Sequence, residues 1–155
     1  MYSNSHLLPL MSVATQDHRM LYECMENYRR FSTSTSRQDW VAAFDAIDQI
    51  IDGAAGEHFA MEEARIFPAV AHVYPTPSVL RCIAELEEEH AALLEQVRQI
   101  NVQLDYKPVS QGPNPILNRQ LLDFFAALGR HALREDKLFA DVNRLIYSVG
   151  VPLDA

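Results

Sequence analysis

The chain has 155 residues, of which 48% are hydrophobic and only five are glycine, a composition that favours one helical domain over a β-sheet protein. Its formal net charge of −8 makes nucleic acid and anionic membranes unfavourable partners, because an acidic surface repels phosphate. The sequence has no basic leader and no run of about 18 apolar residues, so we expect a cytoplasmic protein. Cys24 and Cys82 lack metal-binding or redox spacing and are expected to be buried thiols.

The first predicted helix covers residues 9–31 and follows a tail at residues 1–8 that carries His6. Pro9 suits the first position of a helix, and the serine- and threonine-rich stretch 32–36 ends it. The core-facing stripe recurs at steps of three and four residues and consists of Met11, Ala14, His18, Leu21, Tyr22, Met25 and Tyr28. Tyr22 and Tyr28 are interpreted as packing residues, with a role beside a ligand as the alternative.

The second predicted helix is a continuous one over residues 37–73. Its stripe consists of Trp40, Phe44, Ile47, Ile51, Ala54, His58, Met61, Glu62, Ile66 and Ala69. His72 falls in its last turn, where a cation favours the helix dipole, so no ligand role is assigned to it. The prolines at positions 75 and 77 then stop the helix and turn the chain.

The third and fourth predicted helices cover residues 78–104 and 116–149, and the segment 105–115, with three prolines, is a loop. The third stripe includes Ile83, Leu86, His90, Leu93, Val97 and Ile100. The fourth includes Leu117, Leu121, Phe124, Leu128, His131, Glu135, Leu138 and Val142. The run Glu87–Glu89 is interpreted as a solvated face, with support of the site by Glu89, next to His90, as the alternative.

Four long helices with short connections predict an all-α fold, an up-down-up-down antiparallel four-helix bundle over residues 1–155. Counted from Pro75, His58 and His90 lie 17 and 15 residues away, so they should reach similar heights. Counted from Ser34, His18 and His58 lie 16 and 24 residues away. That mismatch requires a longer first helix, an irregular connection or a tilt.

One pattern occurs twice: His18 is followed by His58 with Glu62, and His90 by His131 with Glu135. A histidine and a glutamate at i and i+4 share a helix face, although this spacing alone is common in an acidic chain. The conjunction is informative, because each predicted helix carries one histidine on its core stripe. A carboxylate at an apolar position such as Glu135 is costly unless it is paired or binds a metal.

Imidazole and carboxylate ligands suit iron, manganese or zinc. Two octahedral ions offer about twelve positions, and four histidines and two bridging glutamates fill about eight of them. An oxo or hydroxo bridge would take two more and leave about two for O₂, NO or peroxide. A closed structural zinc site does not need this design.

The chain resembles the hemerythrin-like family of HHE cation-binding domains from about His18 to Phe139. The resemblance rests on His58-Phe-Ala-Met-Glu62-Glu63-Ala-Arg-Ile-Phe67-Pro68, Glu87-Glu88-Glu89-His90 and His131-Ala-Leu-Arg-Glu135-Asp136-Lys-Leu-Phe139. It implies a di-iron centre with bridging glutamates and the ligands His18, His58, Glu62, His90, His131 and Glu135.

Leu94 stands where oxygen-carrying hemerythrins have a further histidine, and the long step from His18 to His58 is more similar to the iron-sensing and nitrosative-stress branches. Glu63 and Asp136 lie at i+5, so Glu63 is the alternative to Glu62 as ligand. The expected function is a non-haem di-iron protein that binds or senses O₂, NO, peroxide or iron status. The alternatives are a di-iron enzyme that reduces O₂ or peroxide or donates iron for iron–sulfur cluster repair, and a metal-free helical interaction module; the oligomeric state is left open.

Overall fold

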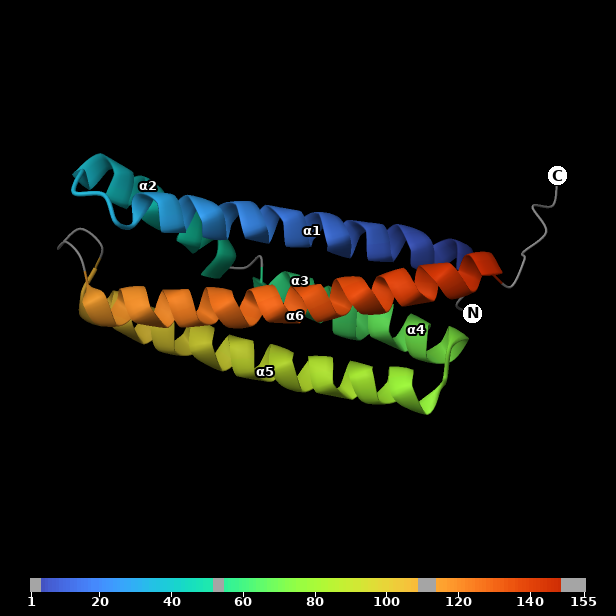
Figure 1. The fold of residues 1–155 in the computed structure, drawn as a ribbon. Coiled ribbons are helices and arrows are strands. Elements are labelled where there is room, and N and C mark those ends of the chain that lie inside the picture. Colours follow the sequence, from blue (N-terminus) through green and yellow to red (C-terminus); the bar gives the residue numbers. More distant parts are fainter. Residues whose placement is uncertain (1–3, 52–54, 109–113, 149–155) are drawn as a thin grey trace.

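The computed structural model describes residues 4–51, 55–108 and 114–148, which are helical apart from short connections and contain no strand. Figure 1 shows helices that run up and down the long axis: α1 (Asn4–Phe31), a segmented second arm, α5 (Pro77–Tyr106) and α6 (Pro115–Ser148). The all-α bundle predicted from the sequence is confirmed. None of the described helices has an apolar stretch long enough to cross a membrane.

Helix α1 begins at Asn4, so the predicted tail over residues 1–8 is wrong from residue 4 onward; residues 1–3 lie outside the described part. His6 is an exposed residue of this helix. Pro9 removes a backbone hydrogen bond inside the helix, at a cost of roughly 3 kcal/mol. Burial of Leu7 and Met11, each worth roughly 1.5–3 kcal/mol, offsets that cost and extends the helix.

The second arm is not the continuous helix predicted over residues 37–73. It consists of α2 (Arg37–Gln49), α3 (Ala55–Met61), the π-helical turn η2 (Glu62–Ile66) and α4 (Phe67–Val73). In Figure 1, α2 lies along α1, whereas α3 and α4 lie further along the bundle. Residues 52–54, which include Gly53, lie outside the described part, and Gly56 lies in the first turn of α3, where a glycine weakens a helix by about 1 kcal/mol.

The last two helices begin and end within two residues of their predicted bounds, because capping residues define their starts. The Thr76 hydroxyl accepts a hydrogen bond from the Val79 N–H at 3.3 Å, just before Pro77 in the first turn of α5. The side-chain oxygen of Asn114 accepts hydrogen bonds from the first turn of α6. The starts predicted from the flanking prolines agree with the structure to within one residue.

The core consists of two hydrophobic clusters separated by a band of buried polar residues. The cluster nearer the α1–α2 connection includes Leu21, Tyr28, Phe44, Phe59, Leu93 and Phe125, and the other includes Met11, Ile66, Phe67, Leu86 and Phe139. Tyr28 is fully buried against Phe44 and Phe125, and its hydroxyl donates to the Asn118 side chain, which confirms its predicted packing role. Burial raises the pKa of Tyr28 to about 12.

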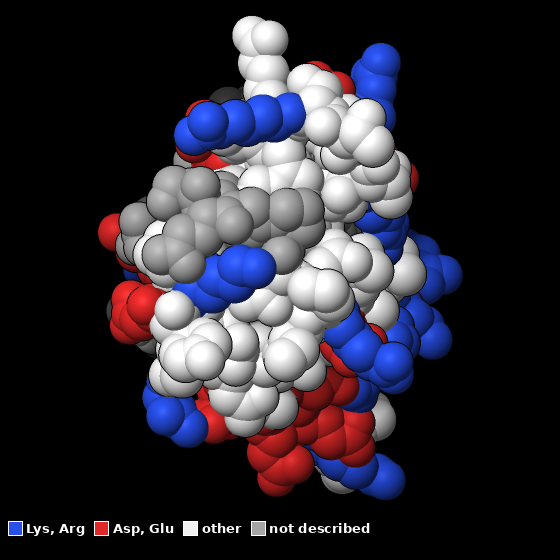
Figure 2. Space-filling view, turned by 90° about the vertical axis from the view of Figure 1, so that its left-hand side faces the viewer, with Lys and Arg blue, Asp and Glu red and all other residues white. Residues whose placement is uncertain are grey.

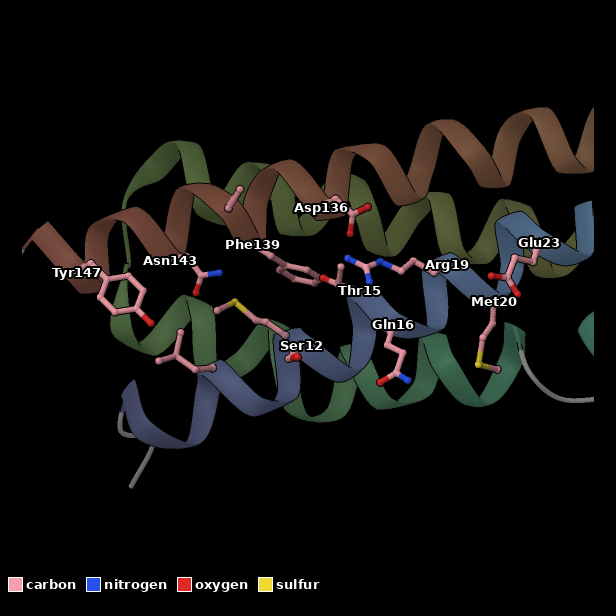
Figure 3. A pocket seen from close by; sticks show the side chains of 13 residues that line it. Ser12, Thr15, Gln16, Arg19, Met20, Glu23, Asp136, Phe139, Asn143 and Tyr147 are labelled. Carbon is pink, nitrogen blue, oxygen red and sulfur yellow. The ribbon is translucent and has the colours of Figure 1, made fainter. Parts of the chain in front are cut away.

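Charged side chains of both signs lie around uncharged ones on the end of the bundle that carries the α1–α2 connection (Figure 2). Along the side of the bundle, a groove of about 880 Å³ runs between α1 and α6 (Figure 3). Its labelled lining is mostly polar and includes Ser12, Gln16, Arg19 and Asn143, with Asp136 on the α6 side.

Candidate metal centre

The buried polar band contains all six residues singled out by the doubled motif. His18 comes from α1, His58 and Glu62 from the second arm, His90 from α5, and His131 and Glu135 from α6. Their exposed fractions lie between 0% and 5%, so water reaches them poorly. Residues up to 117 positions apart in the sequence therefore meet at one point in the core.

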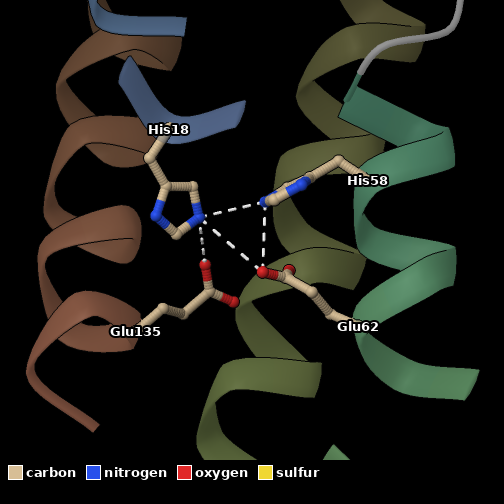
Figure 4. A group of neighbouring side chains, drawn as sticks. All are labelled: His18, His58, Glu62 and Glu135. Atoms are coloured by element: carbon tan, nitrogen blue, oxygen red, sulfur yellow. Dashed lines mark hydrogen bonds and ion pairs between the residues drawn. The ribbon is translucent and has the colours of Figure 1, made fainter. Parts of the chain in front are cut away.

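The first half of the site gathers His18, His58, Glu62 and Glu135 (Figure 4). One ligand atom from each lies within 4.8 Å of the others. The Nε2 atoms of His18 and His58 are 3.0 Å apart, and Glu62 Oε1 lies 3.1 Å from Nε2 of His58. Glu135 Oε2 lies 3.0 Å from Nε2 of His18.

The second half gathers His90 and His131 around the same two carboxylates. Glu62 Oε2 lies 3.3 Å from Nε2 of His90, and Glu135 Oε1 lies 2.8 Å from Nε2 of His131 and 3.2 Å from Nε2 of His90. Each glutamate thus directs one oxygen to the His18–His58 pair and the other to the His90–His131 pair. This is the arrangement of a carboxylate that bridges two cations.

The atoms at the centre are close together, yet many are poorly aligned for hydrogen bonds. Both oxygens of Glu62, Oε2 of Glu135 and Nε2 of His131 have neighbours at about 3 Å but no hydrogen-bond partner. Ligand atoms about 2.1 Å from an octahedral ion lie about 3 Å from one another, as these atoms do. Buried acceptors without a donor are costly, so the residues present fit a cation better than they fit one another.

In the protein without a cation, protons hold the site together. Burial by itself lowers the pKa of His18, but the nearby carboxylates of Glu135 and Glu62 outweigh it and raise that pKa to about 10. The pKa of His90 is raised to about 10 by the same two carboxylates against the same effect of burial. Conversely, burial favours neutral Glu62 and Glu135, but the surrounding histidines lower both pKa values. The positive charges of two imidazolium groups thus balance the negative charges of the two carboxylates. Bound cations can supply that positive charge instead.

A second layer of carboxylates holds the outer nitrogen of every histidine. Nδ1 of His58 lies 3.2 Å from Asp17, that of His90 2.8 Å from Glu63, that of His131 2.7 Å from Glu89, and that of His18 2.7 Å from Asp136. We call Asp17, Glu63, Glu89 and Asp136 the outer carboxylates. Because each accepts a hydrogen bond from the Nδ1–H, each histidine keeps its Nε2 lone pair for the centre.

The outer carboxylates connect the helices in a closed order. Asp17 of α1 supports the histidine of α3, Glu63 of η2 supports that of α5, Glu89 of α5 supports that of α6, and Asp136 of α6 supports that of α1. Each of them is adjacent in sequence to one of the six central residues. The orientation of every histidine therefore depends on a neighbouring helix.

The π-helical turn separates the roles of Glu62 and Glu63. The Phe67 N–H donates to the carbonyl of Glu62, five residues back, which inserts one residue into the helix. Glu62 is fully buried in the centre, whereas Glu63 lies behind His90 and is half exposed. Of the two candidates left open by the spacing, the structure brings Glu62 to the centre.

Sequence reasoning missed part of this arrangement. Asp17 was not singled out, and the interpretation of Glu89 as part of a solvated face is wrong, because Glu89 binds His131 and Arg134. Adjacency to a central residue is the signal that could have found both. Leu94 is 43% exposed while Leu93 is buried, so position 94 faces away from the site.

Comparison with known proteins agrees with the geometry. The family model described as the hemerythrin HHE cation binding domain matches residues 11–142, a range that includes all six central residues and all four outer carboxylates. No curated protein and no solved structure matches the chain.

Proposed function

The chain belongs to the hemerythrin HHE cation-binding domain family, and from that premise we propose that it is a non-haem di-iron protein that binds or senses a small ligand: O₂, NO or peroxide. The observation that carries the proposal is the division of both central glutamates between two histidine pairs. A single ion would need only one such set. Two sets that share Glu62 and Glu135 support a pair of ions held by two bridging carboxylates.

The donor set supports iron. Four imidazole nitrogens and four carboxylate oxygens are ligands that iron and manganese accept in octahedral geometry, and neither cysteine belongs to either described cluster. These eight atoms leave about four of the roughly twelve positions of two octahedral ions for solvent or a small ligand. When bound, an iron pair supplies redox chemistry and Lewis acidity toward that ligand.

The surrounding residues keep the site dry and its histidines in place. The ring of His90 lies between Phe59, at a centroid distance of 4.2 Å, and Phe67, at 5.7 Å, and is nearly parallel to both. Phe139 lies parallel to His18 at 6.5 Å. These aromatic walls exclude water, and the outer carboxylates prevent rotation of the rings, so the central nitrogens are positioned before a ligand arrives.

Metal analysis and spectroscopy test the proposal. The purified protein is expected to hold about two irons per chain, to absorb near-ultraviolet and blue light in its oxidised form, and to change that spectrum when NO is added to the reduced form. His58→Ala should lower the iron content, whereas His6→Ala, an exposed histidine of α1, should not. Less than one metal per chain, or equal metal content in both variants, would contradict it.

A further inference from the structure

A pocket of about 370 Å³ between α1 and α3 reaches one of the central histidines. Its floor is formed by Leu21, Ile50 and His58, all at least nine-tenths buried. Val13 and Met20, at the mouth, are about half exposed. The pocket therefore extends from the surface of the bundle to the edge of the metal centre.

The walls of this pocket are mostly apolar. Half-buried Cys24 and Met61 lie between the mouth and the floor. The polar residues of the lining are His58 on the floor, Asp17, which is bonded to Nδ1 of His58, and exposed Glu57. A molecule inside the pocket thus finds dispersion contacts but few free hydrogen-bond partners.

The other pockets beside the site have a different character. The larger groove between α1 and α6 is lined by polar and apolar groups in similar measure and reaches Asp136, an outer carboxylate, rather than a central ligand (Figure 3). A small pocket of about 170 Å³ touches His131, but Glu89, Gln96 and Arg130 line it. Of these two pockets that reach a central histidine, the one at His58 is the larger and the more apolar.

We propose that the pocket at His58 is the access route and holding site for a small uncharged diatomic gas, O₂ or NO, on its way to the metal centre. This inference rests on the proposed function and narrows its ligand class. An apolar gas loses little hydration when it enters such a cavity, whereas peroxide or an anion loses hydrogen bonds that these walls do not replace. Apart from His131 in the small pocket beside Glu89, the remaining central residues line none of these pockets.

Xenon tests the cavity without any metal chemistry, because it occupies dry apolar cavities. A crystal of the metal-free protein under xenon pressure should show xenon between α1 and α3. Cys24→Phe should remove it by filling the wall. Cys82→Phe is the matched control, because this second half-buried cysteine lies in a pocket between α5 and α6 that contains none of the six central residues. Absence of xenon from the wild-type pocket would overturn the proposal.

Rapid mixing of the reduced, iron-loaded protein with NO tests the route. Cys24→Phe should slow NO association about tenfold, an increase of about 1.4 kcal/mol in the barrier, with iron content unchanged, whereas Cys82→Phe should keep the wild-type rate. Val13→Trp, at the exposed mouth, provides a second blocked variant that does not disturb the core. If wild-type adduct formation is normal but both blocked variants keep its rate, the route is wrong and the proposed function stands; if the iron-loaded wild type forms no adduct, both are wrong.

Discussion

Asp136 accepts a hydrogen bond from Nδ1 of His18 at 2.7 Å, although 118 positions separate the two residues in the chain. Asp136 follows Glu135, one of the two central glutamates, so a single turn of α6 supplies one carboxylate to the centre and another to the back of a histidine on α1. The metal centre and the packing of α1 on α6 therefore depend on the same pair of neighbouring residues.

Asp136→Asn should lower metal affinity about 10- to 100-fold, because the neutral amide no longer holds the Nδ1–H or increases the basicity of the ring. A chelator competition titration measures the change. Asp141→Asn is the control on the same helix, since Asp141 pairs with exposed Arg144 and lies outside the outer carboxylates. Equal affinity of the two variants would show that the contact between His18 and Asp136 has no part in metal binding.

Glu62→Gln and Glu63→Gln should have unequal effects, although the two residues are neighbours. Glu62 faces both histidine pairs, so its amide variant should hold less than about one metal per chain. Glu63 contacts only the outer nitrogen of His90 among the four histidines, so its variant should keep its metal stoichiometry with affinity lowered about tenfold or more. Metal content and affinity should be measured for both variants. A larger loss in Glu63→Gln than in Glu62→Gln would refute the assignment of Glu62 to the centre.

The metal-free protein should be most stable in mildly acidic solution. The raised pKa values of His18 and His90, about 10, contribute stability that is complete below their ordinary 6.5 and is lost as pH rises through about 10. The lowered pKa values of Glu62 and Glu135 contribute stability that is complete above their ordinary 4.5 and is lost as pH falls. Melting temperatures of the metal-free protein should therefore be highest between about pH 4.5 and 6.5.

Metal binding should reverse the dependence of stability on pH that the metal-free protein shows above about pH 6.5. Metal ions displace the protons of His18 and His90, so metal uptake near neutral pH should release about two protons and its affinity should rise with pH. Calorimetry in buffers of different ionisation enthalpy counts those protons. A metal-free protein whose melting temperature rises steadily from pH 6.5 to 9 would contradict the charge balance inferred for the centre.

Phe59→Ala should destabilise the protein by about 3–5 kcal/mol, because Phe59 is fully buried and stacks on His90. Leu133→Ala on α6, at a position 64% exposed, should cost less than about 0.5 kcal/mol. Denaturant unfolding of the metal-free variants measures both. Similar losses would mean that the aromatic wall beside His90 does not contribute to the core.

The regular part of the fold was predictable because strong local signals define it. Proline, threonine and asparagine caps mark the starts of α5 and α6, and the three- and four-residue steps locate every histidine on an inward face. The division of the second arm into α2 and α3 was not predicted, since Ile50, Ile51 and Ala55 continue the apolar stripe across Gly53 in the sequence. Periodicity cannot distinguish a helix that continues from one that resumes after a break.

The six central residues were predictable because apolar surroundings make a buried histidine or glutamate conspicuous. The outer carboxylates were less conspicuous, because Asp17, Glu89 and Asp136 are only partly buried and, apart from their adjacency to central residues, resemble ordinary surface acids in sequence. The choice between Glu62 and Glu63 depends on the π-helical turn, whose extra residue leaves no clear mark in the hydrophobic pattern. The roles of the outer carboxylates and of Glu62 are thus determined by contacts between helices.

The closed order of the outer carboxylates has an internal two-fold symmetry. Exchanging His18 with His90, His58 with His131, Glu62 with Glu135, Glu63 with Asp136 and Asp17 with Glu89 maps the four outer contacts onto one another. Two of these contacts stay within one half of the chain and two cross between the halves. The centre is therefore organised as a homodimer of helical hairpins would be, and none of its contacts requires the peptide connection between α4 and α5.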